Sequence, residues 1–294
     1  MNPRFAPLIP ALLLIAASPA SGAPDWQAVD HVLGRTGAVQ AGGVHRYGFP
    51  RSDLHVTLDG VAIRPALALG SWVAFREMGN HAEVMGDLVL TQEEVNPVLS
   101  RLLESGLTIT ALHNHLLRSA PATMYMHIHG HGDPAKLASD IRAALAASAT
   151  PLTPPGPPSQ QPAVIDTSAL DRSLAGKGQI NGGVVQYGFP RADAVMEYGH
   201  PVPASLGLAT SINIQPTPAG KAVATGDFVL TAAEVDPVLR ALRTNGIEVT
   251  ALHNHMTDEQ PRLFFMHFWG NGSEAALAAG LAAALDKMNL VRQR

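Results

Sequence analysis

The 294-residue chain contains no cysteine and no run of lysine or arginine. Without cysteine it has no disulfide, no thiolate nucleophile and no N-terminal cysteine for lipid attachment. Any metal ion must be held by histidine, aspartate, glutamate or backbone oxygen. The 24 acidic and 20 basic residues give a formal net charge of −4 without the basic patch of a nucleic-acid-binding protein. We therefore expect no nucleic-acid partner.

Common catalytic motifs are also absent. The chain has no Gly-x-Ser-x-Gly, no phosphate-binding glycine loop and no His-Glu-x-x-His. These absences remove the usual patterns of serine hydrolases, nucleotide-binding proteins and zinc proteases. The hydrophobic content of 46% is typical of a packed globular protein.

The first 20 residues have the layout of a secretory signal peptide. Arg4 precedes a short apolar run that ends in small residues at 17–20. We predict that residues 1–20 are removed after Ala20, which makes the mature protein periplasmic or secreted. The alternative is an uncleaved membrane anchor. About a dozen apolar residues interrupted by prolines are fewer than the ~20 that a spanning helix needs, so we expect no stable membrane span.

The rest of the chain is an internal duplication with a shift of 140 residues. The shift superimposes YGFPRSD (47–53) on YGFPRAD (187–193) and GDLVLTQEEVNPVLSRL (86–102) on GDFVLTAAEVDPVLRAL (226–242). TALHNH occurs at both 110–115 and 250–255. Because the repeat is far longer than a solenoid unit, each copy is expected to be a domain with its own core.

A proline-rich segment separates the copies. ATPLTPPGPPSQQPA, at residues 149–163, contains six prolines and few residues suited to a core. The predicted organisation is a first repeat domain at 24–148, a linker at 149–163 and a second repeat domain at 164–294.

Each copy predicts an α+β fold, a mostly antiparallel sheet with about two packed helices in the order β-β-β-β-α-β-β-α. Alternation of apolar and polar residues indicates strands at 42–49, 54–58, 71–75, 82–90, 107–116 and 123–132. Apolar residues at helical spacing follow residue 93, and an alanine-rich helix begins at Asp133, or at Ser273 in the second copy.

The first helix has two candidate start points. Thr91 and Glu94 form a possible capping box, whereas Asn96 followed by Pro97 is a good N-cap with proline at the first helical position. Proline inside a helix loses a hydrogen bond, so we predict the later start.

The histidines are the main candidate site. Alternate strand residues lie on one face, so His113 and His115 share a face, as do His127, His129 and His131 on the next strand. A loop centred on residue 120 would place His113 opposite His127, and a slip of two residues would place His115 there instead. Cross-strand Cβ atoms ~4.5–5.5 Å apart would let several imidazoles meet on one ion.

The second copy keeps part of this pattern. It has Trp269 and Asn271 where the first copy has His129 and His131. Zinc and copper are the expected metals because neutral imidazole binds both. The predicted ligands are His113, His115, His127, His129, His131, His253, His255 and His267. The alternative is that these histidines are hydrogen-bonded members of a sheet, copied with their scaffold.

Other repeated polar residues have competing interpretations. Asp87 and its counterpart Asp227 follow glycine at the expected entry of a strand, which favours an Asx-type turn over a ligand or catalytic role. Glu94 and its counterpart Glu234 are equally suited to a capping box and to a metal shell or general base.

Each of the two GFPR segments contains an arginine that is suited to a structural salt bridge. Arg51 is expected to pair with Asp53, and Arg191 with Asp193, because each aspartate stands two residues later. This interpretation is favoured over capture of an anion by the arginines.

Together, GGV…YGFPR.D, GD.VLT..EV.PVL and TALHNH followed by MH resemble the LppY/LpqO family of exported bacterial proteins. The resemblance spans nearly the whole mature chain and implies an envelope protein built from a tandem domain of unknown function. Several members are named lipoproteins, and this chain departs from them because it lacks the cysteine for lipid attachment.

The leading hypothesis is an exported protein that binds a divalent transition metal through three histidines in each repeat. Three-histidine coordination leaves a position open, which makes a metal-dependent hydrolase or lyase an alternative. A second alternative is a non-catalytic module for an envelope polymer or protein, with Trp72, Trp269, Tyr47 and Tyr187 as contact candidates. A metal-free hydrolase with histidine as base lacks an evident nucleophile. The sequence identifies neither a substrate nor an envelope partner.

Overall fold

The computed structural model describes residues 23–154, 156 and 167–293. The predicted signal peptide and most of the predicted linker lie outside the described residues. Within the described part of the chain, no helix has the length and apolarity needed to cross a membrane.

The first repeat contains a six-stranded sheet, three longer helices and short additional elements. Its elements are α1 (Trp26–Leu33), β1 (Ala38–Gln40), η1 (Ala41–Gly43), β2 (Val44–Pro50), β3 (Thr57–Leu58), β4 (Val61–Ala62), α2 (Pro65–Ala68), β5 (Gly70–Met78), β6 (His81–Thr91), α3 (Gln92–Glu104), β7 (Thr108–His113), β8 (Thr123–Gly132) and α4 (Pro134–Leu145).

The second repeat follows the same plan, with a 3-10 turn where the first has α2. Its elements are α5 (Thr167–Leu174), β9 (Gln179–Asn181), β10 (Val184–Pro190), β11 (Met196–Glu197), β12 (His200–Pro201), η2 (Ala204–Leu206), β13 (Ala209–Thr217), β14 (Lys221–Thr231), α6 (Ala232–Thr244), β15 (Glu248–His253), β16 (Leu263–Ser273) and α7 (Glu274–Leu285).

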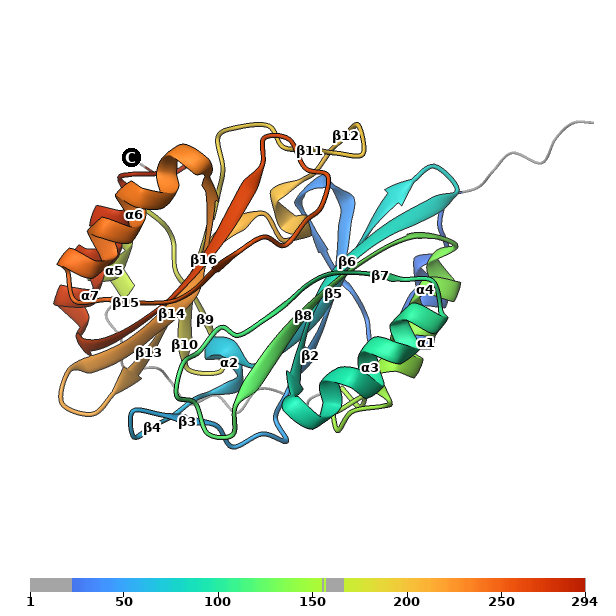
Figure 1. Cartoon of the computed structure of the whole chain (residues 1–294), viewed down its shortest axis with the longest axis horizontal. Coiled ribbons are helices and arrows are strands. Elements are labelled where there is room, and N and C mark those ends of the chain that lie inside the picture. The colour runs from blue at the N-terminus through green and yellow to red at the C-terminus, as the bar shows by residue number, and fades with distance from the viewer. Residues whose placement is uncertain (1–22, 155, 157–166, 294) are drawn as a thin grey trace, which may run out of the picture.

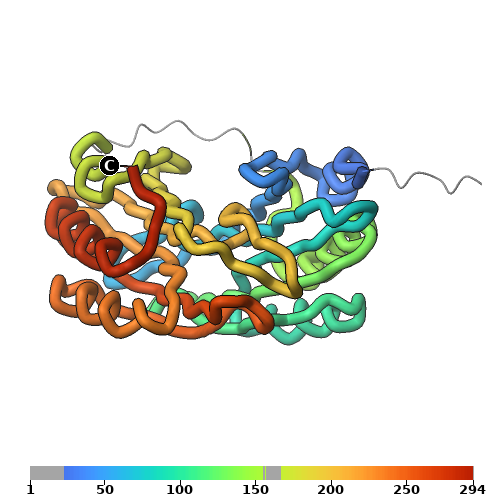
Figure 2. The backbone as a smooth tube through the Cα atoms, turned by 90° about the horizontal axis from the view of Figure 1, so that it is seen from above, coloured from blue at the N-terminus to red at the C-terminus, as the bar shows by residue number. Residues whose placement is uncertain are grey.

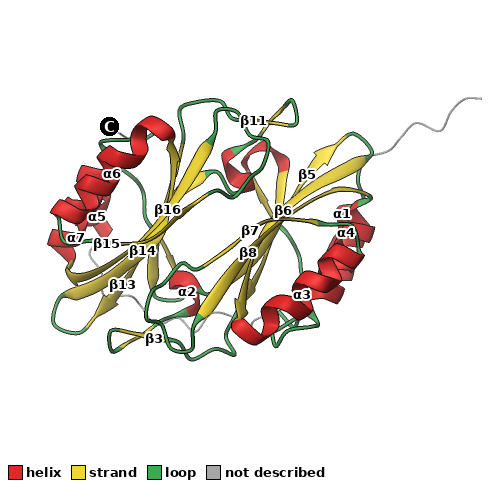
Figure 3. Ribbon diagram, viewed as in Figure 1, coloured by secondary structure: helices red, strands yellow, loops and turns green. Residues whose placement is uncertain are grey.

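Both large sheets are antiparallel and have equivalent strand orders. The order is β1-β2-β5-β6-β8-β7 in the first repeat and β9-β10-β13-β14-β16-β15 in the second. The longer helices lie on the outer flank of each sheet, and the two sheets occupy the middle of the molecule (Figure 1, Figure 3). The predicted α+β class with two homologous domains is confirmed.

The structure adds one helix at the start of each repeat and shortens one predicted strand. Asp25 caps α1 by accepting backbone hydrogen bonds, and Gly34 ends it in the left-handed conformation. These are ordinary helix signals that the strand-based order omitted. The strand expected at 54–58 is wrong in extent, because only Thr57–Leu58 is extended and it pairs with β4 outside the main sheet.

The predicted later start of α3 is also wrong. The helix begins at Gln92 and contains Pro97, because Glu94 accepts a hydrogen bond of 2.8 Å from the Thr91 N–H and completes a capping box. Glu94 also pairs with buried Arg51 at 2.7 Å. These contacts outweigh the single backbone hydrogen bond that proline removes.

Each repeat has its own core, and further apolar clusters join the repeats. One core lies between the first sheet and α1, α3 and α4, and another lies between the second sheet and α5, α6 and α7. Two other clusters combine residues of both repeats, with Val44 beside Leu206 in one and Leu58 beside Trp269 in the other. The expectation of separate cores therefore describes only part of the packing.

Hydrogen bonds hold the repeats together at the same places. The segment from β4 to α2 reaches the second sheet, where Gln215 donates to the Ala62 carbonyl at 2.8 Å and Asn213 donates to the Leu67 carbonyl at 2.9 Å. In return, Ser205 donates to the Ala41 carbonyl at 2.7 Å. The halves lie side by side with their longer helices at opposite ends (Figure 2), so the sheet faces that carry no long helix face each other.

Candidate metal centre between the repeats

The hairpin of β7 and β8 places the first set of histidines. His113 pairs with Tyr125 across the hairpin, and Ala111 pairs with His127. The predicted pairing of His113 with His127 is therefore wrong by two residues. Because side chains alternate with a period of two, this displacement leaves His113 and His127 on the same face. The second repeat has the same register, with Ala251 opposite His267.

The two histidine sets predicted as separate sites lie against each other. Ring centroids are 3.5 Å apart for His113 and His253, and 3.7 Å apart for His115 and His267. Those of His127 and His255 are 3.6 Å apart. Each close pair joins one repeat to the other, so the histidines form one centre with approximate two-fold symmetry.

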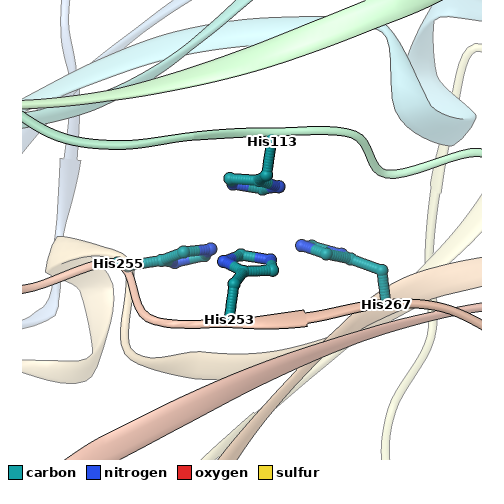
Figure 4. A group of neighbouring side chains, drawn as sticks. All are labelled: His113, His253, His255 and His267. Carbon is teal, nitrogen blue, oxygen red and sulfur yellow. The ribbon is translucent and has the colours of Figure 1, made fainter.

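Two overlapping groups within this centre have metal-ligand spacing. The donor atoms of His113, His253, His255 and His267 all lie within 4.8 Å of one another, and so do those of His113, His115 and His127. Figure 4 shows His113 facing the three second-repeat histidines from the opposite ribbon. Ligand nitrogens ~2.0–2.1 Å from one ion would be at most about 4.2 Å apart, so small ring movements would complete coordination.

Backbone carbonyls orient several of these rings. The Nδ1–H of His113 donates to the Asn114 carbonyl at 3.1 Å, and the Nδ1–H of His267 donates to the Gly226 carbonyl at 2.9 Å. His253 makes the equivalent contact with Asn254 at 3.3 Å. A proton on Nδ1 leaves Nε2 with a free lone pair, which is the usual arrangement around a metal-binding histidine.

The Nε2 atoms and the nearby carboxylates lack hydrogen-bond partners. Among the described residues, twelve buried side-chain nitrogen or oxygen atoms have no partner. Eight of them are in this centre: Nε2 of His113, His115, His127, His253, His255 and His267, and Oδ1 of Asp87 and Asp227. Buried polar groups are normally satisfied, so this concentration makes the centre a candidate site for a bound cation.

Asp87 and Asp227 lie at the edge of the histidine centre. Each lies within a long strand, β6 or β14, so the interpretation as Asx-type turns is wrong. Asp87 is 3.8 Å from the Nε2 atoms of His115 and His127, and Asp227 is 3.9 Å from Nε2 of His267. These distances are too long for hydrogen bonds.

Burial sets the charge state of the centre when no cation is bound. Burial raises the pKa of Asp87 to about 8, and burial together with Asp87 raises the pKa of Asp227 well above its usual value. Burial and the neighbouring His253 lower the pKa of His113 to about 3. The remaining imidazoles are shifted in the same direction, so the donors are neutral and ready for a cation.

A cavity of about 1130 Å³ between the sheets reaches this centre. Asp87, Asp227, His115, His127 and His255 form part of its lining. A small molecule in the cavity would therefore lie beside the histidines.

His129 and His131 lie outside the shared centre. His129 is 3.2 Å from Glu83, and with Glu197 of the second repeat these residues form a separate group that has metal-ligand spacing. Glu83 is also paired with Arg76, which partly neutralises this group. The ring of His131 is 5.4 Å from that of His81.

The other candidate acids have structural partners. Glu94 and Glu234 each bind a buried arginine, Arg51 or Arg191, at 2.7 Å, and neither belongs to a group of metal-ligand spacing among the described residues. The predicted pair of Arg51 with Asp53 is confirmed at 2.7 Å, as is that of Arg191 with its own aspartate. The capping role of both glutamates is the one that their contacts support.

The aromatic contact candidates are mostly internal. Tyr47 and Tyr187 are buried in the two helix-facing cores, and Trp269 is buried between the repeats. Trp72 is half-buried and lines the cavity.

Two residues that line the cavity or the His129 group could not be identified from the sequence. Arg46 lines the cavity, and Glu197 meets His129 from the opposite repeat. Neither belongs to a repeated polar motif, because position 186 holds glutamine and position 57 holds threonine. In the sequence, only the duplicated histidines could have suggested a shared centre. The 140-residue repeat does not specify how the two copies face each other.

Comparison with known proteins identifies the repeat. The family described as "Domain of Unknown Function (DUF1259)" matches residues 27–147 and again residues 168–287. No curated protein matches the chain.

Two solved structures are distant likenesses. A trimeric bacterial microcompartment shell protein, PduB, is 14% identical, with 87% of this chain and 96% of that chain covered and a TM-score of 0.25. EtuB from Clostridium kluyveri is 9% identical, with 86% and 89% covered and a TM-score of 0.21. Scores this low support no argument about the function of this chain.

Proposed function

The chain belongs to the family described as Domain of Unknown Function (DUF1259), and we propose that it binds a divalent transition-metal ion between its two repeats. The ligands are His113 from the first repeat with His253, His255 and His267 from the second. Zinc and copper are the metals best suited to an all-imidazole donor set.

The cluster of unpartnered buried atoms carries this proposal. Eight donor atoms without hydrogen bonds converge from both repeats, and three of the imidazoles have Nδ1 tied to a carbonyl. A purely structural histidine would satisfy its second nitrogen within the protein or with water. A cation would coordinate four of these atoms directly, and its charge would attract the two nearby carboxylates.

Charge balance favours one ion per chain. Neutral imidazoles do not balance the positive charge of a dication. Asp87 and Asp227 would supply two negative charges once a cation lowers their pKa. A second dication would leave a net positive charge in a buried site, which is costly. In this arrangement His115 and His127 lie beside the four ligands and do not bind a second ion.

We also propose that the protein is exported and is a soluble member of the LppY/LpqO group. The support is the signal-like composition of residues 1–20 and the repeated motifs. The absence of cysteine argues against a lipid anchor of the kind that the lipoprotein members carry.

A metal-dependent hydrolase or lyase is the second candidate function. It is favoured by the cavity, because His115, His127 and both aspartates line a space large enough for a substrate. A bound ion would supply Lewis-acid chemistry at that surface, and an aspartate beside it could accept or hold a proton.

Elemental analysis tests the metal proposal. Protein prepared from the periplasm without an affinity tag, and the same protein after incubation with zinc or copper and desalting, should contain one metal ion per chain. Less than ~0.2 ion per chain after loading would exclude a tight metal site. A ratio of two would exclude the shared four-histidine arrangement in favour of one ion in each repeat.

Matched variants locate the ion. The double variant His113→Ala, His253→Ala should lose the metal while its circular dichroism spectrum stays that of the parent. Replacement of exposed His55 and His200 by alanine removes the same number of imidazoles outside the centre and should leave the metal content unchanged. Equal loss in both double variants would mean non-specific surface binding.

A further inference from the structure

The wall of the cavity differs between the two repeats. Arg46 on β2 and Trp72 on β5 line it in the first repeat, and their counterparts by strand register are Gln186 and Ser211. At these two positions one side of the cavity is therefore cationic and aromatic, whereas the other is neutral and polar. Lys177 of the second repeat also lines the cavity, but it is paired with Asp171 at 2.8 Å. The duplication began with equal walls, so this difference gives the cavity two distinct ends.

The guanidinium of Arg46 is held in place without using its hydrogen-bond donors. Its central carbon lies 3.8 Å from the centroid of the Trp72 ring, a stacking contact that fixes its plane. Among the described residues, none accepts a hydrogen bond from this guanidinium, and none forms an ion pair with it. Fully buried arginines are normally paired, as Arg51 and Arg191 are in this protein, whereas half-buried Arg46 is not.

The counterpart in the second repeat is fully engaged. Gln186 donates to the Ala66 carbonyl at 2.8 Å and accepts a hydrogen bond from Asn181 at 3.2 Å. Its amide belongs to the contact between the repeats and has little capacity for a ligand. The contrast indicates that Arg46 is available for a ligand and that Gln186 is structural.

The charge of Arg46 is retained at neutral pH. Burial lowers its pKa to about 10, and the nearby Asp87 opposes this shift. Asp87 is not a close partner, because the two groups form no salt bridge. The side chain is thus a half-buried cation that faces a cavity and lacks a neutralising contact, which is an environment that favours binding of an anion.

We propose that the cavity binds a small organic carboxylate, with the carboxylate group on Arg46 and the rest of the molecule extending toward the histidine centre. A planar guanidinium with free donors matches a carboxylate through two parallel hydrogen bonds. A monoanion is preferred to a phosphate dianion because Asp87 and Asp227 balance the charge of the proposed metal dication, which leaves only the single positive charge of Arg46 to be neutralised. The role of this molecule as a substrate rests on the proposed metal centre, whereas its binding to Arg46 does not.

The cavity has room for such a ligand. Its volume of about 1130 Å³ is at the upper end of small-molecule sites. Thr225 and Gln40 offer further polar atoms along the lining, and Met85 and Leu206 provide apolar surface. This mixture suits a hydrophilic monocarboxylate such as a sugar acid or a short hydroxy acid.

Calorimetric titration of the full-length protein tests the site. The probes are the monoanions D-glucuronate and D-lactate, with D-glucose as an uncharged match and inorganic phosphate as the alternative oxyanion. The variant Arg46→Gln introduces the residue that the second repeat has at this position, so it should fold normally. Arg46→Lys keeps the charge but loses the planar fork, and Arg101→Gln removes an exposed arginine elsewhere.

The expected result is that a carboxylate probe binds and D-glucose does not. Arg46→Gln should weaken carboxylate binding by roughly tenfold or more, the usual effect of losing charged hydrogen bonds, and Arg46→Lys should fall between it and the parent. Arg101→Gln should bind as the parent does.

Several results would overturn the proposal. These are no binding of either carboxylate, equal binding by Arg46→Gln, or tighter binding of phosphate than of both carboxylates. Metal content measured on the same samples separates the two proposals. A metal-free protein that still binds carboxylate through Arg46 would refute the metal centre alone, and a metal-loaded protein indifferent to carboxylate would refute this site alone.

Discussion

Removal of the proposed metal ion should lower the melting temperature of the protein, because the ligands come from both repeats and exist as a site only when the repeats are docked. At free zinc of 100 times Kd, binding adds about 2.7 kcal/mol to the free energy of unfolding. In a protein of this size ~1 kcal/mol corresponds to roughly 2–4 °C, so the zinc-dependent shift should be about 5–10 °C.

The variant His113→Ala tests the origin of this shift. His113 is the only first-repeat histidine in the four-histidine group. Its loss should weaken zinc binding by at least about tenfold, which is the lower end of the effect seen for residues that merely support metal ligands. At the same zinc concentration the added stability falls to about 1.4 kcal/mol or less, and the shift to half or less of its parental value.

Differential scanning calorimetry with zinc and with a chelator measures the shift within each variant, so that any change in metal-free stability cancels. His115→Ala is the matched control, because His115 lies in the centre but outside the four-histidine group. A full shift in His113→Ala, or an equal loss in His115→Ala, would refute the proposed ligand set.

Three further predictions concern the scaffold. Arg51→Met should destabilise the protein by ~3 kcal/mol in urea unfolding, because it leaves Glu94 without its buried partner; a loss below ~1 kcal/mol would contradict this reasoning. Hydrogen bonds from Arg51 lower the folded-state pKa of Glu94 despite burial, so its stabilising contribution is complete above an unfolded pKa of ~4.3 and is lost as pH falls. The stability difference between the parent and Glu94→Gln should therefore shrink from pH 6 to pH 3, and a constant difference would rule out the ion pair as its cause. Gly226→Ala should destabilise more than Gly86→Ala in the same assay, because the added Cβ would lie 2.0 Å from the Ser211 carbonyl oxygen in one case and 2.9 Å from the nearest backbone oxygen in the other; the reverse order would contradict the strand spacing.

Local patterns were sufficient for much of the fold. The alternation of residues in TALHNH predicted that His113 and His115 share a strand face. The strand β7 ends at His113, so the prediction is wrong for His115, although the two rings still lie 5.1 Å apart. The start of α3 was predicted wrongly because a local rule about Pro97 was weighed without Arg51, which is distant in sequence and binds Glu94 in the capping box.

The sequence by itself determined the duplication, the α+β class and the two sets of three histidines, because each depends on spacing along one stretch of chain. Only the tertiary structure decided that the two sets form one centre, that Asp87 belongs to it, and that Arg46 faces the adjoining cavity. The physical reason is that docking of the repeats depends on apolar clusters and hydrogen bonds contributed jointly by distant segments. A 140-residue shift repeats each surface, but it does not specify which face of one copy meets the other.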